Sequence, residues 1–179
     1  FQVDHHMGIA AAGYIPDARG QVNDIRFFSQ SSKLVYDEPV DVGTVAKYTA
    51  DEFQHYTQYA GVRPMGVALI IGGVDNNGNA LFLADPSGTY VAYNAVAIGA
   101  NSDIVTDFLK KEYKPNMTID EGSTLAIAAI YLASEIKKGT KHIKISQIRS
   151  DTKQFEIITD EHLTKLAEST VEKYPTEHK

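Results

Sequence analysis

The sequence predicts an α+β protein with mainly antiparallel sheets. Short apolar segments are separated by tight-turn sequences such as Asn77-Gly78, which is typical of β-hairpins. Segments with apolar residues at helical spacing come in pairs between them. Helices that arrive in pairs suggest helical layers outside two packed sheets.

The first part of the chain is expected to form one strand and two helices. Met7–Tyr14 is rich in small residues and predicts a strand that allows close packing of another layer. Pro16-Asp17 begins a helix, which ends at Tyr36-Asp37-Glu38-Pro39. A second helix covers about Gly43–Tyr59, because its apolar residues lie along one face.

Three strands linked by hairpins should follow. They are Gly66–Val74, Ala80–Ala84 and Thr89–Ile98. The first is apolar on both faces, which favours a central strand. Asn77-Gly78 can supply the positive φ values of the first turn, and Asp85-Pro86-Ser87-Gly88 forms the second.

Two further helices come next. Asn101 or Ser102 caps the first, and Thr118 with Glu121 has the spacing of a capping box at the start of the second. The second should be the most buried helix, since residues 125–136 are apolar nearly all round. Lys137-Lys138-Gly139 is expected to end it.

A last hairpin and a last helix complete the chain. The hairpin joins Ile143–Ile148 to Phe155–Ile158 around Asp151-Thr152-Lys153, and the helix covers about Glu161–Lys173. Residues 174–179 are polar, and we expect them to fray. No long linker divides the sequence, so we expect a single domain over residues 1–179.

Composition restricts the classes of function. The net charge is −6, which argues against a general nucleic-acid surface and against attraction to anionic membranes. The sequence contains no cysteine, so disulfides, thiolate catalysis and Cys-based metal sites are excluded, as fits a cytoplasmic protein. Neither a signal peptide nor an apolar run long enough to span a bilayer is expected.

Five segments in order carry a resemblance to a known family. The run from Tyr56 to Val67 is the most informative, because a helix stops at Gly61 and a rigid Arg63-Pro64 corner leads into an apolar strand. Together the segments resemble proteasome α subunits of the 20S core particle, especially archaeal ones. They are residues 13–19, 36–40, 56–67, 85–90 and 97–99.

The resemblance implies a fold and a function. The family adopts the four-layer α-β-β-α sandwich of N-terminal nucleophile hydrolases. Its α subunits are not catalytic, form seven-membered rings that cap the proteolytic β rings, gate the pore and dock activators. Implied partners are other α subunits, β subunits, protein substrates in transit and an activator ATPase with a C-terminal hydrophobic–Tyr–X tail. No cofactor is implied. The N-terminal helix and first strands of the family precede the position of Phe1 and are expected to be absent here.

Gly13 and Tyr14 are the candidate binding residues. They match the Gly–apolar pair that lines the activator pocket of the family, although Tyr14 stands where leucine is more usual. The alternative is that Gly13-Tyr14 merely ends a strand. Strand ends are common places for binding residues, and backbone groups with a cation can hold a peptide carboxylate there.

The other singled-out residues have structural interpretations. Arg63, Pro64 and Gly66 form the corner, where Pro64 fixes the backbone and Arg63 can pair with a carboxylate or cap carbonyls. Asp85, Ser87 and Gly88 hold a turn through local side-chain bonds. Ser87 lacks the surroundings of a nucleophile elbow, so no catalytic residue is predicted.

Two rival functions and a metal site are weighed against the resemblance. A catalytic β-type subunit, or another N-terminal nucleophile hydrolase, needs Thr, Ser or Cys at the mature N-terminus, whereas this chain starts with Phe1. An unrelated αβ interaction domain would have to share all five segments by chance. His5 and His6 are adjacent, and neighbouring strand residues point to opposite faces, so no metal site is predicted.

Overall fold

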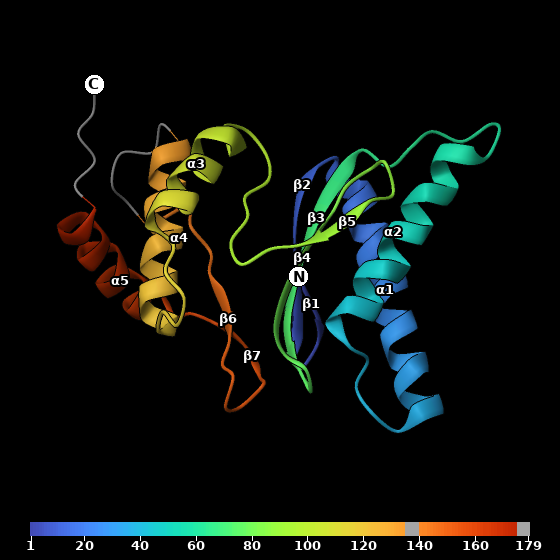
Figure 1. The fold of residues 1–179 in the computed structure, drawn as a ribbon, viewed down its shortest axis with the longest axis horizontal. Coiled ribbons are helices and arrows are strands. Elements are labelled where there is room, and N and C mark those ends of the chain that lie inside the picture. The colour runs from blue at the N-terminus through green and yellow to red at the C-terminus, as the bar shows by residue number, and fades with distance from the viewer. Residues whose placement is uncertain (135–139, 175–179) are drawn as a thin grey trace. The chain divides into compact units, whose positions relative to one another are not determined.

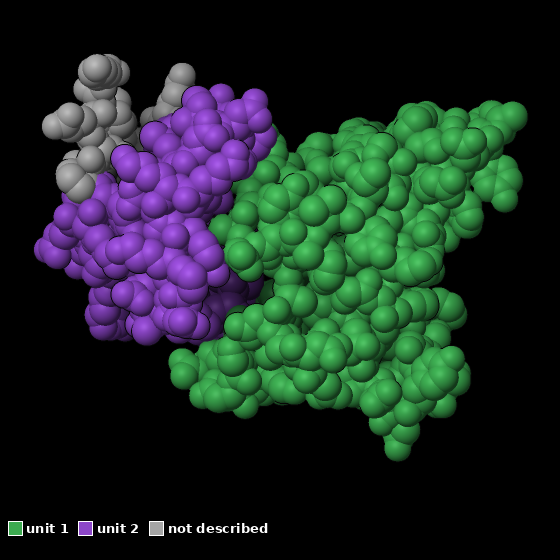
Figure 2. Space-filling view, viewed as in Figure 1, with its two compact units in different colours: residues 1–99, 148–155 green, residues 100–147, 156–179 purple. Residues whose placement is uncertain are grey.

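The computed structural model describes residues 1–134 and 140–174 (Figure 1). Its contacts divide the chain into two compact units, which Figure 2 shows in different colours. Unit 1 comprises Phe1–Gly99 and Ile148–Phe155, and unit 2 comprises Ala100–Gln147 and Glu156–Lys179. The single-domain expectation stays a prediction, and each unit is described by itself.

Unit 1 contains a five-stranded antiparallel sheet. Its strands, in spatial order, are β1 (Gln2–Asp4), β2 (Met7–Gly13), β3 (Val67–Asp75), β4 (Gly78–Ala84) and β5 (Tyr90–Ala92). The central position of β3 agrees with its apolar character on both faces. The predicted α+β class with mainly antiparallel pairing is confirmed.

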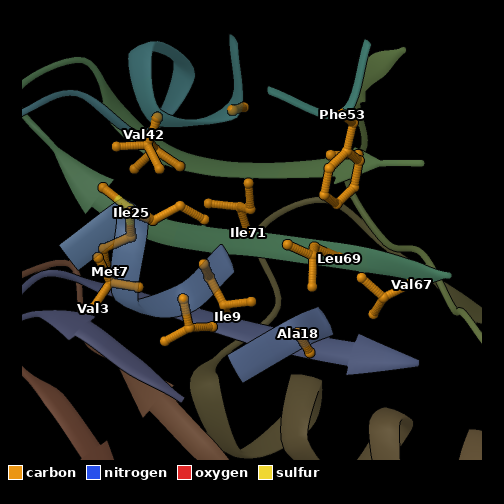
Figure 3. Packing of buried hydrophobic residues seen from close by; sticks show 14 of the residues in the cluster. Val3, Met7, Ile9, Ala18, Ile25, Val42, Phe53, Val67, Leu69 and Ile71 are labelled. Carbon is orange, nitrogen blue, oxygen red and sulfur yellow. The ribbon is translucent and has the colours of Figure 1, made fainter. Parts of the chain in front are cut away.

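Two helices pack against this sheet. They are α1 (Ile15–Tyr36) and α2 (Val42–Gln58), close to the predicted bounds. Ile9 pairs with Ile71 across β2 and β3, and both side chains enter the core with Phe53 of α2 (Figure 3). Phe53, Ile71 and Leu69 are fully buried, so this apolar layer is the main source of stability in unit 1.

Two predictions in the sheet are wrong in detail. The strand expected over Thr89–Ile98 is reduced to Tyr90–Ala92, and the chain leaves the sheet after Tyr93 donates its N–H to Leu81. The apolar residues of this segment favoured a long strand, but a strand also needs a neighbouring strand with which to form hydrogen bonds. The unpredicted strand β1 places His5 and His6 in the turn that follows it, not within a strand.

The turn between β3 and β4 also differs from the prediction. Asp75 pairs with Gly78, so Asn76 and Asn77 are the turn residues. Only Gly78 has positive φ, at 111°, and Asn77 does not. The Asp75 carboxylate accepts the N–H of Asn77 at 2.7 Å, and this local bond holds Asn77 in the ordinary region.

Unit 2 is built mainly from helices. They are α3 (Ser102–Glu112), α4 (Ile119–Ala133) and α5 (Asp160–Lys173). The short strands β6 (Ser146–Ile148) and β7 (Phe155–Ile157) form a last hairpin, which includes residues of both units. The hairpin was predicted, but β6 begins at Ser146 instead of Ile143 and β7 ends at Ile157 instead of Ile158. The core of unit 2 contains Ile127 and Tyr131 of α4 with Leu163 and Leu166 of α5.

The helix ends in unit 2 test the capping predictions. The capping box of Thr118 and Glu121 is confirmed. Asn101 occupies the N-cap position of α3 with φ of 58°, but its side chain donates to the carbonyl of Ala133 instead of capping the helix. Helix α4 ends at Ala133, before the predicted end. Lys137-Lys138-Gly139 and residues 175–179 lie outside the described residues.

Candidate functional site

The end of β2 meets the start of β3 at a close backbone contact. Gly13 has φ of 123°, and a Cβ atom on it would lie 2.3 Å from the carbonyl oxygen of Gly66. The next residue, Tyr14, donates its N–H to that same oxygen at 2.7 Å. A side chain at position 13 would therefore both strain the backbone and separate the two strands.

Arg63 fastens this junction to the first turn of α1. Its Nη1 and Nη2 donate to Oδ2 and Oδ1 of Asp17 at 2.6 and 2.8 Å, and Nη1 also donates to the carbonyl of Pro64 at 3.0 Å. Asp17 Oδ2 in addition accepts the N–H of Gly66 at 2.9 Å. The hydrogen bonds from Arg63, followed by that from Gly66, lower the pKa of the Asp17 carboxyl group.

The junction presents an aromatic ring and a cation to solvent. Tyr14 is 54% exposed, and the guanidinium carbon of Arg63 lies 5.3 Å from the centre of its ring. The Asp17 side chain is only 13% exposed, beneath the exposed Arg63 side chain. We define these residues, Gly13, Tyr14, Asp17, Arg63 and Gly66, as the Gly13–Gly66 junction.

The structure thus unites residues that the sequence left apart. Gly13 and Tyr14 were candidates for binding, whereas Arg63, Pro64 and Gly66 were assigned to a corner 50 residues further along the chain. Asp17 was missed as a member of the site. The expectation that Arg63 pairs with a carboxylate was a signal for it, but several acidic residues fitted that expectation equally well.

Asp85, Ser87 and Gly88 lie in a separate turn after β4. Asp85 accepts the N–H of Ser87 at 2.7 Å and the hydroxyl of Thr89 at 2.6 Å. Burial raises the pKa of Asp85, but the hydrogen bonds from Ser87 and Thr89 outweigh it and lower the pKa overall. Gly88 has φ of 87°, and a Cβ there would lie 2.6 Å from that of Gln54, so the turn packs directly on α2.

A second polar cluster lies at the end of β1 and in the turn that leads to β2. Asp4, His5 and His6 bring one carboxylate oxygen and two imidazole nitrogens within 4.8 Å of one another. The sequence reasoning set the histidines aside because it placed them on opposite faces of a strand. In the turn, their ring centres are 4.9 Å apart. The neighbouring Asp4 had not been singled out.

Comparisons with known proteins point to one family. The family model described as "Proteasome subunit" matches residues 1–148. The "Proteasome subunit alpha" of Methanosarcina barkeri is 38% identical over 180 residues, which cover 100% of this chain and 72% of that protein. That of Methanothermobacter thermautotrophicus is 38% identical over 91% of this chain and 66% of its own. The "Proteasome subunit alpha 1" of Haloarcula marismortui is 41% identical over 89% and 62%.

Proposed function

Because this chain belongs to the proteasome α-subunit family, we propose that it is a non-catalytic subunit of the outer ring of a 20S core particle. The main support for this proposal is the 38% identity to an archaeal α subunit along the whole of this chain. In this role the chain forms a seven-membered ring, caps a β ring of threonine-type proteases and controls the entry of protein substrates. The rival catalytic β-type assignment has no support among the relatives described above.

The proposed partners follow from this role. They are other α subunits, β subunits, protein substrates in transit and an activator ATPase, and no cofactor takes part. Within the described ranges, no helix is both long and apolar enough to cross a bilayer. We place the assembly in the cytoplasm. The net charge of −6 on this chain agrees with the absence of nucleic acid from its partners.

The Gly13–Gly66 junction is our candidate for part of the activator pocket. The exposed ring of Tyr14 offers an apolar surface to the hydrophobic and tyrosine residues of a hydrophobic–Tyr–X tail. The two hydrogen bonds from Arg63 to Asp17 fix the backbone beneath that ring, which lowers the entropy lost on binding. A neighbouring α subunit would supply the rest of the pocket.

Assembly tests the main proposal. The full-length chain is produced alone and together with a β subunit of the same organism, and both samples are measured by native mass spectrometry and peptide hydrolysis. We expect rings in the first sample without hydrolysis and a peptidase-active complex in the second. Hydrolysis that follows the purified chain alone through repurification, or monomers in both samples, would contradict the proposal.

Tyr14→Ala in the assembled ring tests the pocket. A Gly13→Tyr change would fill the pocket, but the φ of 123° means that it would also distort the strand end. Tyr14 is exposed, so its removal spares the fold. We expect weaker binding of a C-terminal hydrophobic–Tyr–X peptide to Tyr14→Ala and unchanged binding to Tyr59→Ala, which removes a tyrosine of similar exposure. Equal affinities of the two variants would refute the pocket assignment.

A further inference from the structure

The last residue of β1 and the two turn residues after it are three potential metal ligands in succession. Asp4 pairs with Met7, so His5 and His6 are the two residues of the turn. Asp4 and His6 are 8% and 2% exposed, whereas the His5 side chain is 36% exposed. The cluster is therefore buried on one side and open to solvent at His5.

Hydrogen bonds to the backbone fix this turn in place. The carbonyl of His6 accepts the N–H of Val74 at 3.1 Å, and the carbonyl of His5 accepts the N–H of Phe155 at 2.6 Å. A Cβ atom on Gly73 would lie 2.6 Å from the His6 carbonyl oxygen, so β3 runs directly against the turn. A backbone held from two sides presents its side chains in a preorganised arrangement.

The tautomer of His6 leaves a lone pair opposite a carboxylate. His6 Nε2 lies 2.9 Å from the carbonyl oxygen of Val40, which can only accept, so Nε2 carries the proton. In a neutral ring, Nδ1 then exposes its lone pair toward Asp4 Oδ2 at 3.8 Å. Both atoms are buried, and neither has a hydrogen-bond partner in residues 1–134 and 140–174. Two buried acceptors that face each other require a positive charge or a donor between them.

We propose that Asp4, His5 and His6 bind a divalent first-row transition-metal ion, for which Zn²⁺ is the reference. A tetrahedral zinc ion with bonds of about 2.0 Å holds its ligand atoms about 3.3 Å apart. The ligand atoms of the cluster lie within 4.8 Å of one another, so small side-chain rotations bring them to this spacing. Two imidazole nitrogens and one carboxylate favour Zn²⁺, Co²⁺ or Ni²⁺ over Mg²⁺ and Ca²⁺, which prefer oxygen ligands.

His5 supplies access and the first contact with the ion. In the metal-free turn His5 Nδ1 lies 2.9 Å from Asp4 Oδ1, which can only accept, so this nitrogen carries a proton that the ion replaces when it binds. The partly exposed ring of His5 lets a metal ion reach the buried pair. Water from the open side completes the coordination. The bound ion would join the β1–β2 turn to the Val40 loop through His6, and thus stabilise unit 1.

Metal titration of the untagged full-length chain tests the site. The protein is freed of metal with a chelator and titrated with Zn²⁺ by calorimetry and with Co²⁺ by visible absorption. We expect one equivalent to bind and the thermal midpoint to rise, because the ion binds the folded state. The absence of saturable binding would overturn the proposal.

Three variants separate this site from surface histidines. Asp4→Asn and His5→Gln each remove one ligand, and each should weaken Zn²⁺ binding by more than about tenfold. His162→Gln is the matched control, because His162 is an exposed histidine 3.4 Å from Asp120, and it should bind as the parent chain does. His5→Gln changes a half-exposed side chain, so it stays decisive if Asp4→Asn fails to fold. Unchanged affinity in His5→Gln, or loss in His162→Gln, would overturn the proposal.

Discussion

The guanidinium group of Arg63 donates two hydrogen bonds to the carboxylate of Asp17, and that carboxylate also accepts the backbone N–H of Gly66. One acidic side chain thus holds the Arg63 corner and the start of β3 against the first turn of α1. A lysine could not reproduce the two parallel bonds, because its ammonium group lacks the planar fork of arginine. The pair therefore determines how Tyr14 is presented at the surface.

Asp17→Asn should change how stability depends on pH. The pKa of Asp17 is lower in the folded than in the unfolded chain, so its contribution is complete above the unfolded value of about 3.9 and is lost as pH falls through the folded value. The difference in thermal midpoint between parent and variant should be largest near pH 7 and shrink below about pH 4. A difference that stays constant down to pH 2 would exclude this linkage.

Gly13→Ala should destabilise the protein. Gly13 has a left-handed φ of 123°, and the added Cβ would lie 2.3 Å from the carbonyl oxygen of Gly66. We expect this strain to lower the free energy of unfolding by about 1–3 kcal/mol. Gly20→Ala is the matched control. Gly20 lies in α1, and apart from the adjoining backbone of that helix none of the described residues has an atom within 4 Å of an added Cβ there, so alanine should stabilise that helix by about 0.5–1 kcal/mol. Urea unfolding measures both effects, and equal signs would contradict the assignment.

Phe53→Ala should be the most damaging of these substitutions. The ring is fully buried among the side chains of the unit 1 core, and the loss of a buried phenylalanine costs about 3–5 kcal/mol. Phe27 is 77% exposed on α1, so Phe27→Ala should leave the unfolding midpoint almost unchanged. Similar midpoints for the two variants in chemical denaturation would show that Phe53 is not a core residue.

Thr118→Ala should loosen the start of α4. It removes the side chain that accepts the N–H of Glu121 at 3.3 Å, and the loss of such a cap costs about 0.5–2 kcal/mol. Thr118→Ser keeps the acceptor and should behave as the parent does. Hydrogen exchange should rise in the first turn of α4 in Thr118→Ala, while strands β2 and β3 keep their protection. Faster exchange in those strands would argue against a local effect.

Local signals in the sequence were enough for most of the elements. The bounds of α1, α2, β2 and β3 followed from apolar spacing and from Pro and Gly, and the Thr118 capping box needed only two residues. The predicted family is confirmed by the match to the proteasome subunit model. Each of these signals depends on neighbouring residues, which explains why the sequence was sufficient for them.

Contacts between residues that are far apart in the sequence could not be predicted from local patterns. Arg63 and Asp17 are 46 residues apart, and no periodicity specifies which carboxylate an arginine meets. Strand β1 is three residues long, too short for an alternating pattern, and missing it misplaced His5 and His6. The shortening of β5 to Tyr90–Ala92 depends on how far β4 offers a partner, which is a property of the sheet and not of the segment.

The β6–β7 hairpin includes residues of both units, which affects how unit 1 can fold during translation. Unit 1 includes residues 148–155, and Phe155 both donates its N–H to the His5 carbonyl and fills the space beside Gly8. On the ribosome, residues 1–99 therefore emerge without one of their own packing partners. The sheet can form early, but its β1–β2 turn lacks the hydrogen bond from Phe155 until that residue has been made, after the whole segment 100–147. Completion of the first unit is thus tied to translation of most of the second.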